Sequence, residues 1–381
     1  RPKRRLRRSD SAGNAFVIRV SRHMTPGIWK YADRLGDSPS QEHRITLGEG
    51  DTPLVRSRRI GPANGLTNLC FKLESLNPTG SYKDRFAAAA VSHLLAGGVK
   101  QCLATSSGNS GAALAAACAV AGIPIHLAIV EPAPDEKLRQ MLAYGASLTR
   151  IRGFGLNPET TASTFAGLRQ LANRPDRSLE ISAYSVSPLG MRGVETLAFE
   201  LDEQTNSRVR HVFLPAGGGG LCLAVARGFD LCQGSPAVHC VQPEGNDTIV
   251  GPLREGRDHG RRVDLCTTTI GGLQVPNLLD ANAVISACRA SGGNGQLVAD
   301  ASVYELQARL AQEEGIFAEP AGAVALAGAL KAVASGEIDP ESLIVCVVTG
   351  CGFKDGTSLA RMADTTTVPV AEFAEFANRL R

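Results

Sequence analysis

The stretch Leu76-Asn77-Pro78-Thr79-Gly80-Ser81-Tyr82-Lys83-Asp84-Arg85 joins a strand-like segment, residues 69–74, to a helix-like segment, residues 84–95. The proline and glycine within it break regular structure, so a tight turn is expected between the two segments. Lys83 then lies at the mouth of a helix, where the positive end of the helix dipole disfavours the ammonium form. Easy formation of the free amine is what a Schiff-base lysine needs. An ordinary exposed lysine at a helix start fits this stretch equally well.

The composition is that of a globular protein with a large core. The chain has 381 residues, of which 43% are hydrophobic, and a net charge of +3. We therefore expect two domains rather than one. Aromatic residues make up 5%, which argues against a base-stacking surface, and no apolar run reaches the length of a membrane span. No signal peptide is apparent. We expect neither a nucleic-acid nor a membrane partner.

The first fifteen residues differ from the rest of the chain. Six of the first eight are basic: Arg1, Lys3, Arg4, Arg5, Arg7 and Arg8. We expect residues 1–15 to form a disordered, solvated tail. A tether to nucleic acid or to a membrane is the alternative interpretation of this charge.

Ten cysteines are spread along the chain without a CxxC pair. Several lie in apolar runs, as in Val345-Cys346-Val347, where cysteine behaves as a small core residue. A zinc site needs clustered ligands, and no such cluster is visible in the sequence. The pattern predicts reduced thiols, no metal and a cytoplasmic protein.

From about residue 100 onward, strands and helices are expected in alternation. Expected strands are 101–105, 123–130, 147–151, 179–184, 211–215, 238–242 and 343–348. Expected helices are 112–121, 135–144, most of 152–178, 192–204, 221–232, 300–314, 321–334 and 370–380. This alternation predicts an α/β fold of two doubly wound domains with mainly parallel sheets and a ligand cleft between them. The larger domain would contain residues 16–92 plus 205–381, and the smaller one residues 93–204.

Two glycine-rich loops after expected strands offer groups that bind anions. The run Gly217-Gly218-Gly219-Gly220 can turn its backbone amides toward an anion at a helix start. Its spacing matches neither a P-loop nor GxGxxG, so a single phosphate group is the favoured ligand. The run Thr105-Ser106-Ser107-Gly108-Asn109 suits a carboxylate, and the Asn109 amide can donate to a planar ligand. A packing turn and an ordinary helix cap are the alternatives.

A third loop, Thr349-Gly350-Cys351-Gly352-Phe353-Lys354-Asp355, also follows an expected strand. The glycine beside Thr349 lets a ligand ring approach its hydroxyl, although an incidental threonine in a turn is the alternative. The carboxyl ends of parallel strands line one crevice, so the three loops are expected to converge. A lysine nucleophile, a phosphate cradle and neutral hydrogen-bonding groups for a ring together describe a pyridoxal-phosphate site.

This combination resembles the threonine synthases, which belong to the pyridoxal-phosphate enzymes of fold type II. The resemblance covers roughly residues 25–360. It rests on the Lys83 motif and on Gly27-Ile28-Trp29-Lys30-Tyr31, Leu47-Gly48-Glu49-Gly50-Asp51-Thr52-Pro53-Leu54, Glu319-Pro320-Ala321-Gly322-Ala323 and the three loops. It implies a homodimer that acts on a small amino acid.

The resemblance also implies a role for each matching residue. Lys83 would hold the cofactor as a Schiff base and later shuttle protons. Asn109 would bond the ring's phenolic oxygen, and Thr349 would face the pyridine nitrogen. The cofactor phosphate would be bound by Gly217, Gly218, Gly219 and Gly220, and the substrate carboxylate by Thr105, Ser106 and Ser107.

One stretch departs from the family pattern. After the strand near residue 180, threonine synthases usually carry Asn-Ser-x-Asn, then an arginine for the substrate phosphate, then Glu-Gly-Gln-Lys. Here Gly190 stands where that arginine is expected, and Arg192 follows two residues later. Ser185, Ser187 and Arg192 are the remaining candidates for binding the substrate phosphate.

The leading hypothesis is therefore a threonine synthase-like lyase that acts on O-phospho-L-homoserine. A related β-elimination or β-replacement enzyme is the runner-up: a serine/threonine dehydratase, or a phosphoserine-using synthase such as a cysteate synthase. A catalytically silent ligand-binding protein on the same scaffold is the non-enzyme alternative.

Overall fold

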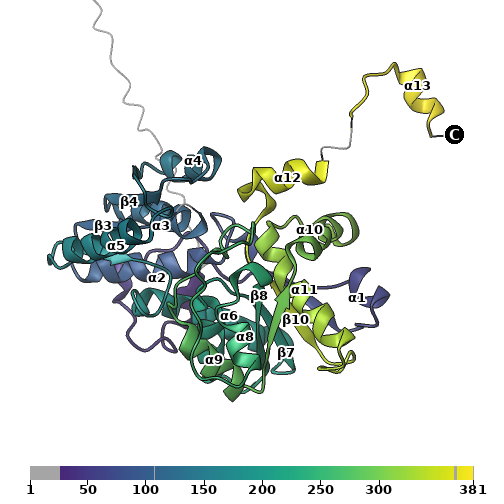
Figure 1. The fold of residues 1–381 in the computed structure, drawn as a ribbon, viewed down its shortest axis with the longest axis horizontal. Coiled ribbons are helices and arrows are strands. Elements are labelled where there is room, and N and C mark those ends of the chain that lie inside the picture. Colours follow the sequence, from purple (N-terminus) through teal and green to yellow (C-terminus); the bar gives the residue numbers. More distant parts are fainter. Residues whose placement is uncertain (1–25, 107, 364–366, 381) are drawn as a thin grey trace, which may run out of the picture.

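Two β-sheets organise the fold of the computed structural model, which describes residues 26–106, 108–363 and 367–380 (Figure 1). The expected tail, residues 1–15, lies outside the described residues. Within the described residues the larger sheet has six strands in the order β1-β2-β10-β7-β8-β9, and the smaller has four in the order β5-β4-β3-β6. The strands are Leu54–Arg56 (β1), Leu69–Leu73 (β2), Gln101–Ala104 (β3), Ile125–Val130 (β4), Ser147–Ile151 (β5), Arg177–Glu180 (β6), His211–Pro215 (β7), Ala237–Pro243 (β8), Gly295–Val298 (β9) and Ile344–Val348 (β10).

The two sheets are mainly parallel. β1 pairs antiparallel with β2, and the other pairings among the described strands are parallel. The predicted fold class is confirmed. Strands from residues 101–180 form the smaller sheet, and strands from residues 54–73 and 211–348 form the larger one. The finer domain boundaries near residues 92 and 205 stay a prediction.

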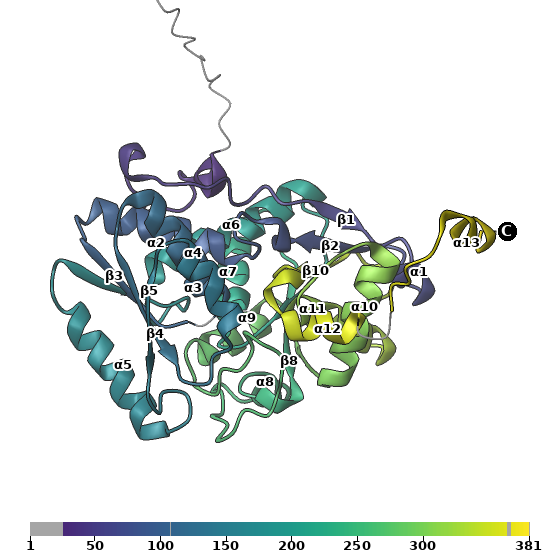
Figure 2. The same ribbon diagram turned by 90° about the horizontal axis from the view of Figure 1, so that it is seen from above.

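Helices cover both faces of each sheet (Figure 2). They are Ile60–Ala63 (α1), Lys83–Ala96 (α2), Asn109–Ala121 (α3), Asp135–Ala143 (α4), Pro158–Ala172 (α5), Pro188–Thr205 (α6), Gly220–Phe229 (α7), Val250–Arg254 (α8), Ala281–Ala290 (α9), Asp300–Glu314 (α10), Pro320–Ala334 (α11), Gly356–Ala363 (α12) and Phe373–Asn378 (α13). None of the helices that the structure describes is long and apolar enough to cross a membrane.

The residues of β10 show why both faces must be covered. Ile344, Cys346 and Val348 pack into the cluster that contains α10 and α11, whereas Val345 and Val347 pack into the cluster that contains α2, α6 and α7. All five residues of β10 are buried. Alternating side chains of a strand point to opposite faces, so a wholly apolar strand needs a helical layer on each side.

Most of the predicted elements form near their expected positions. The strands β1 and β9 and the helices α1, α8, α9 and α12 fall in regions for which no element was predicted. The last helix, expected over residues 370–380, spans Phe373–Asn378.

Candidate active site

The turn that carries Lys83 is held in place by the loop after β10. The Tyr82 amide donates to the Thr349 carbonyl at 3.1 Å, and the Cys351 amide donates to the Gly80 carbonyl at 2.9 Å. Gly80 has a φ of +90°, a conformation that favours glycine. β2 and β10 are neighbours in the larger sheet, so the two loops leave the same edge side by side.

The Lys83 amine lies in a poorly solvated place. Its Nζ donates to the Ser182 hydroxyl at 2.5 Å. Burial lowers the pKa of the Lys83 amine from an ordinary 10.5 to about 7, although the negative charges of Asp280 and Glu319 oppose this change. The free amine is therefore well populated at neutral pH, as a Schiff-base lysine requires. Ser182 was not among the predicted site residues.

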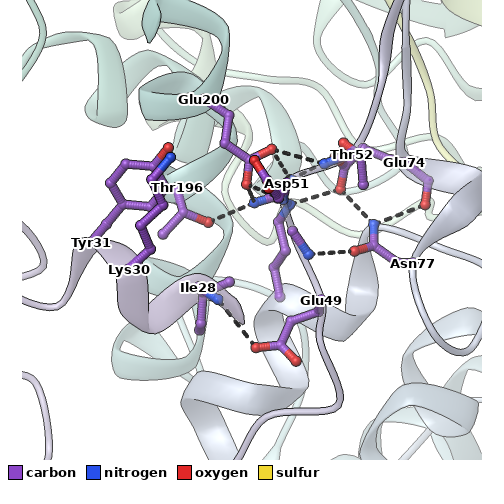
Figure 3. Close-up of polar contacts among 12 residues, drawn as sticks. Ile28, Lys30, Tyr31, Glu49, Asp51, Thr52, Glu74, Asn77, Thr196 and Glu200 are labelled. Atoms are coloured by element: carbon purple, nitrogen blue, oxygen red, sulfur yellow. Dashed lines mark hydrogen bonds and ion pairs between the residues drawn. The ribbon is translucent and has the colours of Figure 1, made fainter. Parts of the chain in front are cut away.

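Two residues beyond Lys83, a buried ionic network anchors the same helix. The Arg85 guanidinium pairs with Glu74 at 2.8 Å and with Glu200 at 2.6 Å, and Lys72 pairs with Glu200 at 2.7 Å. Figure 3 shows the side chains of Glu74, Glu200 and Thr196 directed into this cluster. Burial opposes ionisation of Glu200, but the Arg85 and Lys72 cations outweigh it and hold the pKa of that carboxyl at about 2. The network fixes the first turn of α2, and with it Lys83.

The glycine run lies between β7 and α7, as predicted. Gly219 has a φ of +94° and caps α7, which begins at Gly220. Added Cβ atoms at Gly217 and Gly219 would lie 2.9 Å from Val275 and 2.6 Å from Val284. Among the described residues no acceptor bonds the four amides of this run. They are free to bind an anion at the helix start.

Asp280 is a neighbour of the glycine run that the sequence did not single out. Its amide donates to the Gly218 carbonyl at 3.3 Å. Its carboxylate accepts from the amides of Tyr184 at 2.9 Å and Ser185 at 3.0 Å. Asp280 thereby ties the loop after β6 to the loop after β7, and these belong to different sheets.

Thr349 and Asn109 are the two residues predicted to contact a ligand ring. The Thr349 hydroxyl is buried and has no hydrogen-bond partner among the described residues. Such an orphaned group is costly unless a ligand or water satisfies it. Asn109 is the first residue of α3, and its Nδ2 donates to Glu319 Oε1 at 2.8 Å.

The predicted carboxylate loop follows β3. The Ser106 hydroxyl accepts a hydrogen bond from the Gly108 amide at 3.3 Å, and both Thr105 and Ser106 are half-buried. Ser107 lies outside the described residues. An added Cβ at Gly111 would lie 2.6 Å from the Ser106 carbonyl oxygen, so the loop packs tightly on α3.

The predicted residues for the substrate phosphate are not brought together. The Ser187 hydroxyl accepts from the Ile181 amide at 3.0 Å and so serves the turn before α6. The Arg192 guanidinium pairs with Asp37 at 2.7 Å, and none of its contacts within the described residues is with Lys83 or Ser185. Its expected place beside the substrate stays a prediction.

The structure also gives a reason for Gly190. A Cβ added there would lie 2.7 Å from the Phe86 ring and 2.8 Å from the Ala90 methyl group. α6 and α2 thus approach each other too closely at this point for any larger residue. An arginine at position 190 would require α2 to move.

The chain has a two-sheet α/β fold in which Lys83 follows β2, the glycine run follows β7 and Thr349 follows β10. The family model described as "Pyridoxal-phosphate dependent enzyme" matches residues 45–350, and the chain belongs to this family. It is a pyridoxal-phosphate-dependent lyase, as the sequence predicted.

Curated relatives match along most of their length. The chain is 32% identical to threonine synthase of Methanosarcina acetivorans, over 90% of this chain and 84% of the relative. It is 31% identical to threonine synthase of Mycobacterium leprae, over 91% and 93%. Among solved structures, threonine deaminase isoform 2 of Solanum lycopersicum aligns with a TM-score of 0.71 at 21% identity, over 90% and 94%. Maize serine racemase aligns with a TM-score of 0.69 at 24% identity, over 82% and 92%.

The residues present fit the cofactor. Lys83 has a pKa near neutrality, the amides of residues 217–220 are free for a phosphate, and Thr349 has a buried hydroxyl that needs a partner. The bound cofactor would supply an electron sink for a carbanion at the substrate Cα.

Proposed function

We propose that this enzyme is a threonine synthase, which converts O-phospho-L-homoserine and water to L-threonine and phosphate. The proposal is carried by the similarity to curated threonine synthases over 83–93% of their length. The site chemistry supports it, because an amine that is free near pH 7 can take a proton from carbon. Lys83 is the proposed base for the α-proton and for the later proton transfers.

The other proposed roles follow the family resemblance. The Thr349 hydroxyl would face the pyridine nitrogen; being neutral, it need not keep that nitrogen protonated. Asn109 would donate to the phenolic oxygen, and residues 217–220 would bind the cofactor phosphate. Thr105, Ser106 and Ser107 would bind the substrate carboxylate. Ser182, which accepts the Lys83 hydrogen bond, would orient the amine between its proton transfers.

A second candidate is a β-elimination or β-replacement reaction, as in a serine/threonine dehydratase or a phosphoserine-using synthase. The observation in its favour is the first turn of α6, where Gly190 replaces the expected arginine and Arg192 bonds Asp37 instead. A substrate without a distal phosphate would not need that arginine.

The deciding experiment compares substrates on one purified enzyme. O-phospho-L-homoserine should give equal amounts of phosphate and threonine, whereas threonine and serine should give no keto acid above background. Keto acid from threonine or serine, or phosphate from O-phospho-L-serine alone, would reject the threonine synthase proposal in favour of the second candidate.

Arg192 provides a sharper test of the substrate loop. R192M should change kcat/KM for O-phospho-L-homoserine by less than about threefold, because the guanidinium bonds Asp37. D37N, which removes the partner of the same ion pair, is the matched control. A loss of about 100-fold or more in R192M alone would restore Arg192 to the substrate site.

The finer predictions about assembly and compartment are part of the proposal. We infer a homodimer from the family resemblance, and light scattering of the purified protein tests it. A reducing compartment such as the cytoplasm agrees with the ten cysteines, all of which are free.

A further inference from the structure

Glu319 is a buried carboxylate for which the proposed reaction has no use so far. It stands at the N-cap position of α11 without a capping hydrogen bond from its side chain, is 7% exposed, and forms no salt bridge among the described residues. Its amide donates to the Gly350 carbonyl at 3.0 Å, next to Thr349. Burying an unpaired carboxylate is costly, so its retention beside the site calls for a chemical reason.

The partner of this carboxylate is the side chain of Asn109. Asn109 Nδ2 donates to Glu319 Oε1 at 2.8 Å and comes from α3, which follows a strand of the smaller sheet. The bond therefore crosses between the two sheets. A Cβ added at Gly350 would lie 2.1 Å from Glu319 Oε1 and 3.2 Å from Asn109 Nδ2, so the glycine makes room for the pair.

The nitrogen and the oxygen of a carboxamide have opposite hydrogen-bonding roles. Its nitrogen carries two N–H donors, and its oxygen is an acceptor. A carboxylate is an acceptor only, so it selects the nitrogen of Asn109 and fixes the amide against rotation by 180°. One N–H bonds Glu319, and the second stays available for another acceptor.

We propose that Glu319 is a positioning residue, which holds the Asn109 amide so that its second N–H is presented to the phenolic oxygen of the cofactor. This inference rests on the proposed contact between Asn109 and that oxygen. With glutamine at position 319 both amides could rotate together, and Asn109 could present its own oxygen to the electron-rich phenolic oxygen.

The charges around Glu319 allow its carboxyl to ionise in the folded protein above neutral pH. Burial raises its pKa to about 7, while Lys354 next to Gly80, the Asn109 amide and Lys137 of α4 lower it, and Asp355 raises it. Lys83 and Tyr82 at the start of α2 also lie within range of its charge. Measurements at pH 8 therefore examine the acceptor-only form.

The test measures pyridoxal-phosphate affinity of the apoprotein at pH 8, together with the visible absorption spectrum of the bound cofactor. E319Q should weaken binding about tenfold and change the spectrum when Asn109 is present. In the N109A background the same substitution should change affinity less than twofold. Equal effects of E319Q in both backgrounds, or no effect in either, would overturn the positioning role.

Two further arms keep the test decisive. If E319Q does not fold, G350A places a methyl group against the same pair and should weaken binding in an Asn109-dependent way; an equal effect without Asn109 would count against the proposal. N109A alone distinguishes failure of the Asn109–cofactor contact from failure of the positioning role of Glu319. If N109A leaves affinity and spectrum unchanged, the proposed Asn109 contact fails; if N109A changes them and E319Q does not, the role of Glu319 fails.

Discussion

Two buried polar regions lie two residues apart on the first turn of α2, and they differ in how completely their groups are paired. Around Arg85, the cations Lys72 and Arg85 face the carboxylates Glu74 and Glu200, and each charge has a partner at 2.6–2.8 Å. Around Lys83 the amine meets a single hydroxyl at 2.5 Å, and the Ser81 and Thr349 hydroxyls have no partner among the described residues.

The difference in pairing distinguishes a region that stabilises the fold from one that has groups free for a ligand. Buried polar groups in proteins are normally satisfied, because leaving one unpaired costs about 1–3 kcal/mol. A network that satisfies itself needs nothing more and holds the backbone in place. A cluster that does not satisfy itself leaves polar groups free for a ligand, and we propose that the cofactor is this ligand.

The largest expected effect comes from removing the Lys83 amine, in the region whose polar groups are not all paired. K83M should lower activity about 10³-fold or more and abolish the visible absorbance of cofactor bound to the protein. Steady-state kinetics and absorption spectra of the purified variant measure both. K100M, at an exposed lysine just beyond α2, is the control and should match the wild type. Full activity in K83M would end the assignment of Lys83.

The next largest effect comes from breaking the fully paired ionic network around Arg85. R85M leaves two carboxylates buried without their main partner and should lower the free energy of unfolding by about 3–5 kcal/mol. Urea unfolding of the apoprotein at pH 7 measures this. A loss of less than about 1 kcal/mol would mean that the network does not anchor α2.

The same K83M substitution should raise the stability of the apoprotein, although it lowers activity. The pKa of Lys83 is about 7 folded and about 10.5 unfolded, so the unfolded chain binds more protons between these values. Wild-type stability therefore gains a contribution from Lys83 as pH rises from 7 to 10. K83M should be more stable by roughly 1–3 kcal/mol at pH 7, and the gap should close toward pH 10. A gap that widens with pH would contradict the depressed pKa.

The smallest effect compares one substitution in both regions. T196V removes a hydroxyl that bonds Arg85 at 2.9 Å and Gly193 at 2.6 Å, and should cost about 1–2 kcal/mol. T349V removes an unpartnered hydroxyl and should leave apoprotein stability within about 0.5 kcal/mol, while weakening pyridoxal-phosphate binding. Thermal unfolding and cofactor titration of both variants test the contrast. Equal losses of stability would show that the regions do not differ as described.

Local patterns in the sequence were sufficient for the fold and for placing the three candidate loops after their strands. The turn at Lys83, the glycine run and Thr349 each follow a strand whose apolar residues are contiguous, so their shared edge could be predicted. The helix α9 was missed although Ala281, Val284, Ile285 and Cys288 follow the helical period and are buried. The strand β9 has four residues and follows two glycines, which gives too short a signal.

The supporting residues could not be predicted, because their roles depend on chain segments that meet through the tertiary fold. Lys72 and Glu200 are 128 residues apart, and Asn109 and Glu319 are 210 apart. Ser182 reaches Lys83 across 99 residues. A polar residue in a short motif, such as Glu319 before Pro320, shows its chemistry only when its partner is known.

The close contact at Gly190 restricts how the substrate loop can evolve. An arginine there would meet the Phe86 ring and the Ala90 methyl group, so it needs a smaller residue on α2 first. Truncating a fully buried phenylalanine alone costs about 3–5 kcal/mol, which leaves an intermediate with little stability in reserve. Neither substitution is favourable by itself, so the two sequence types are separated by an epistatic barrier. Directed evolution by single steps would remain on one side of it, whereas libraries that vary positions 86, 90 and 190 together could cross.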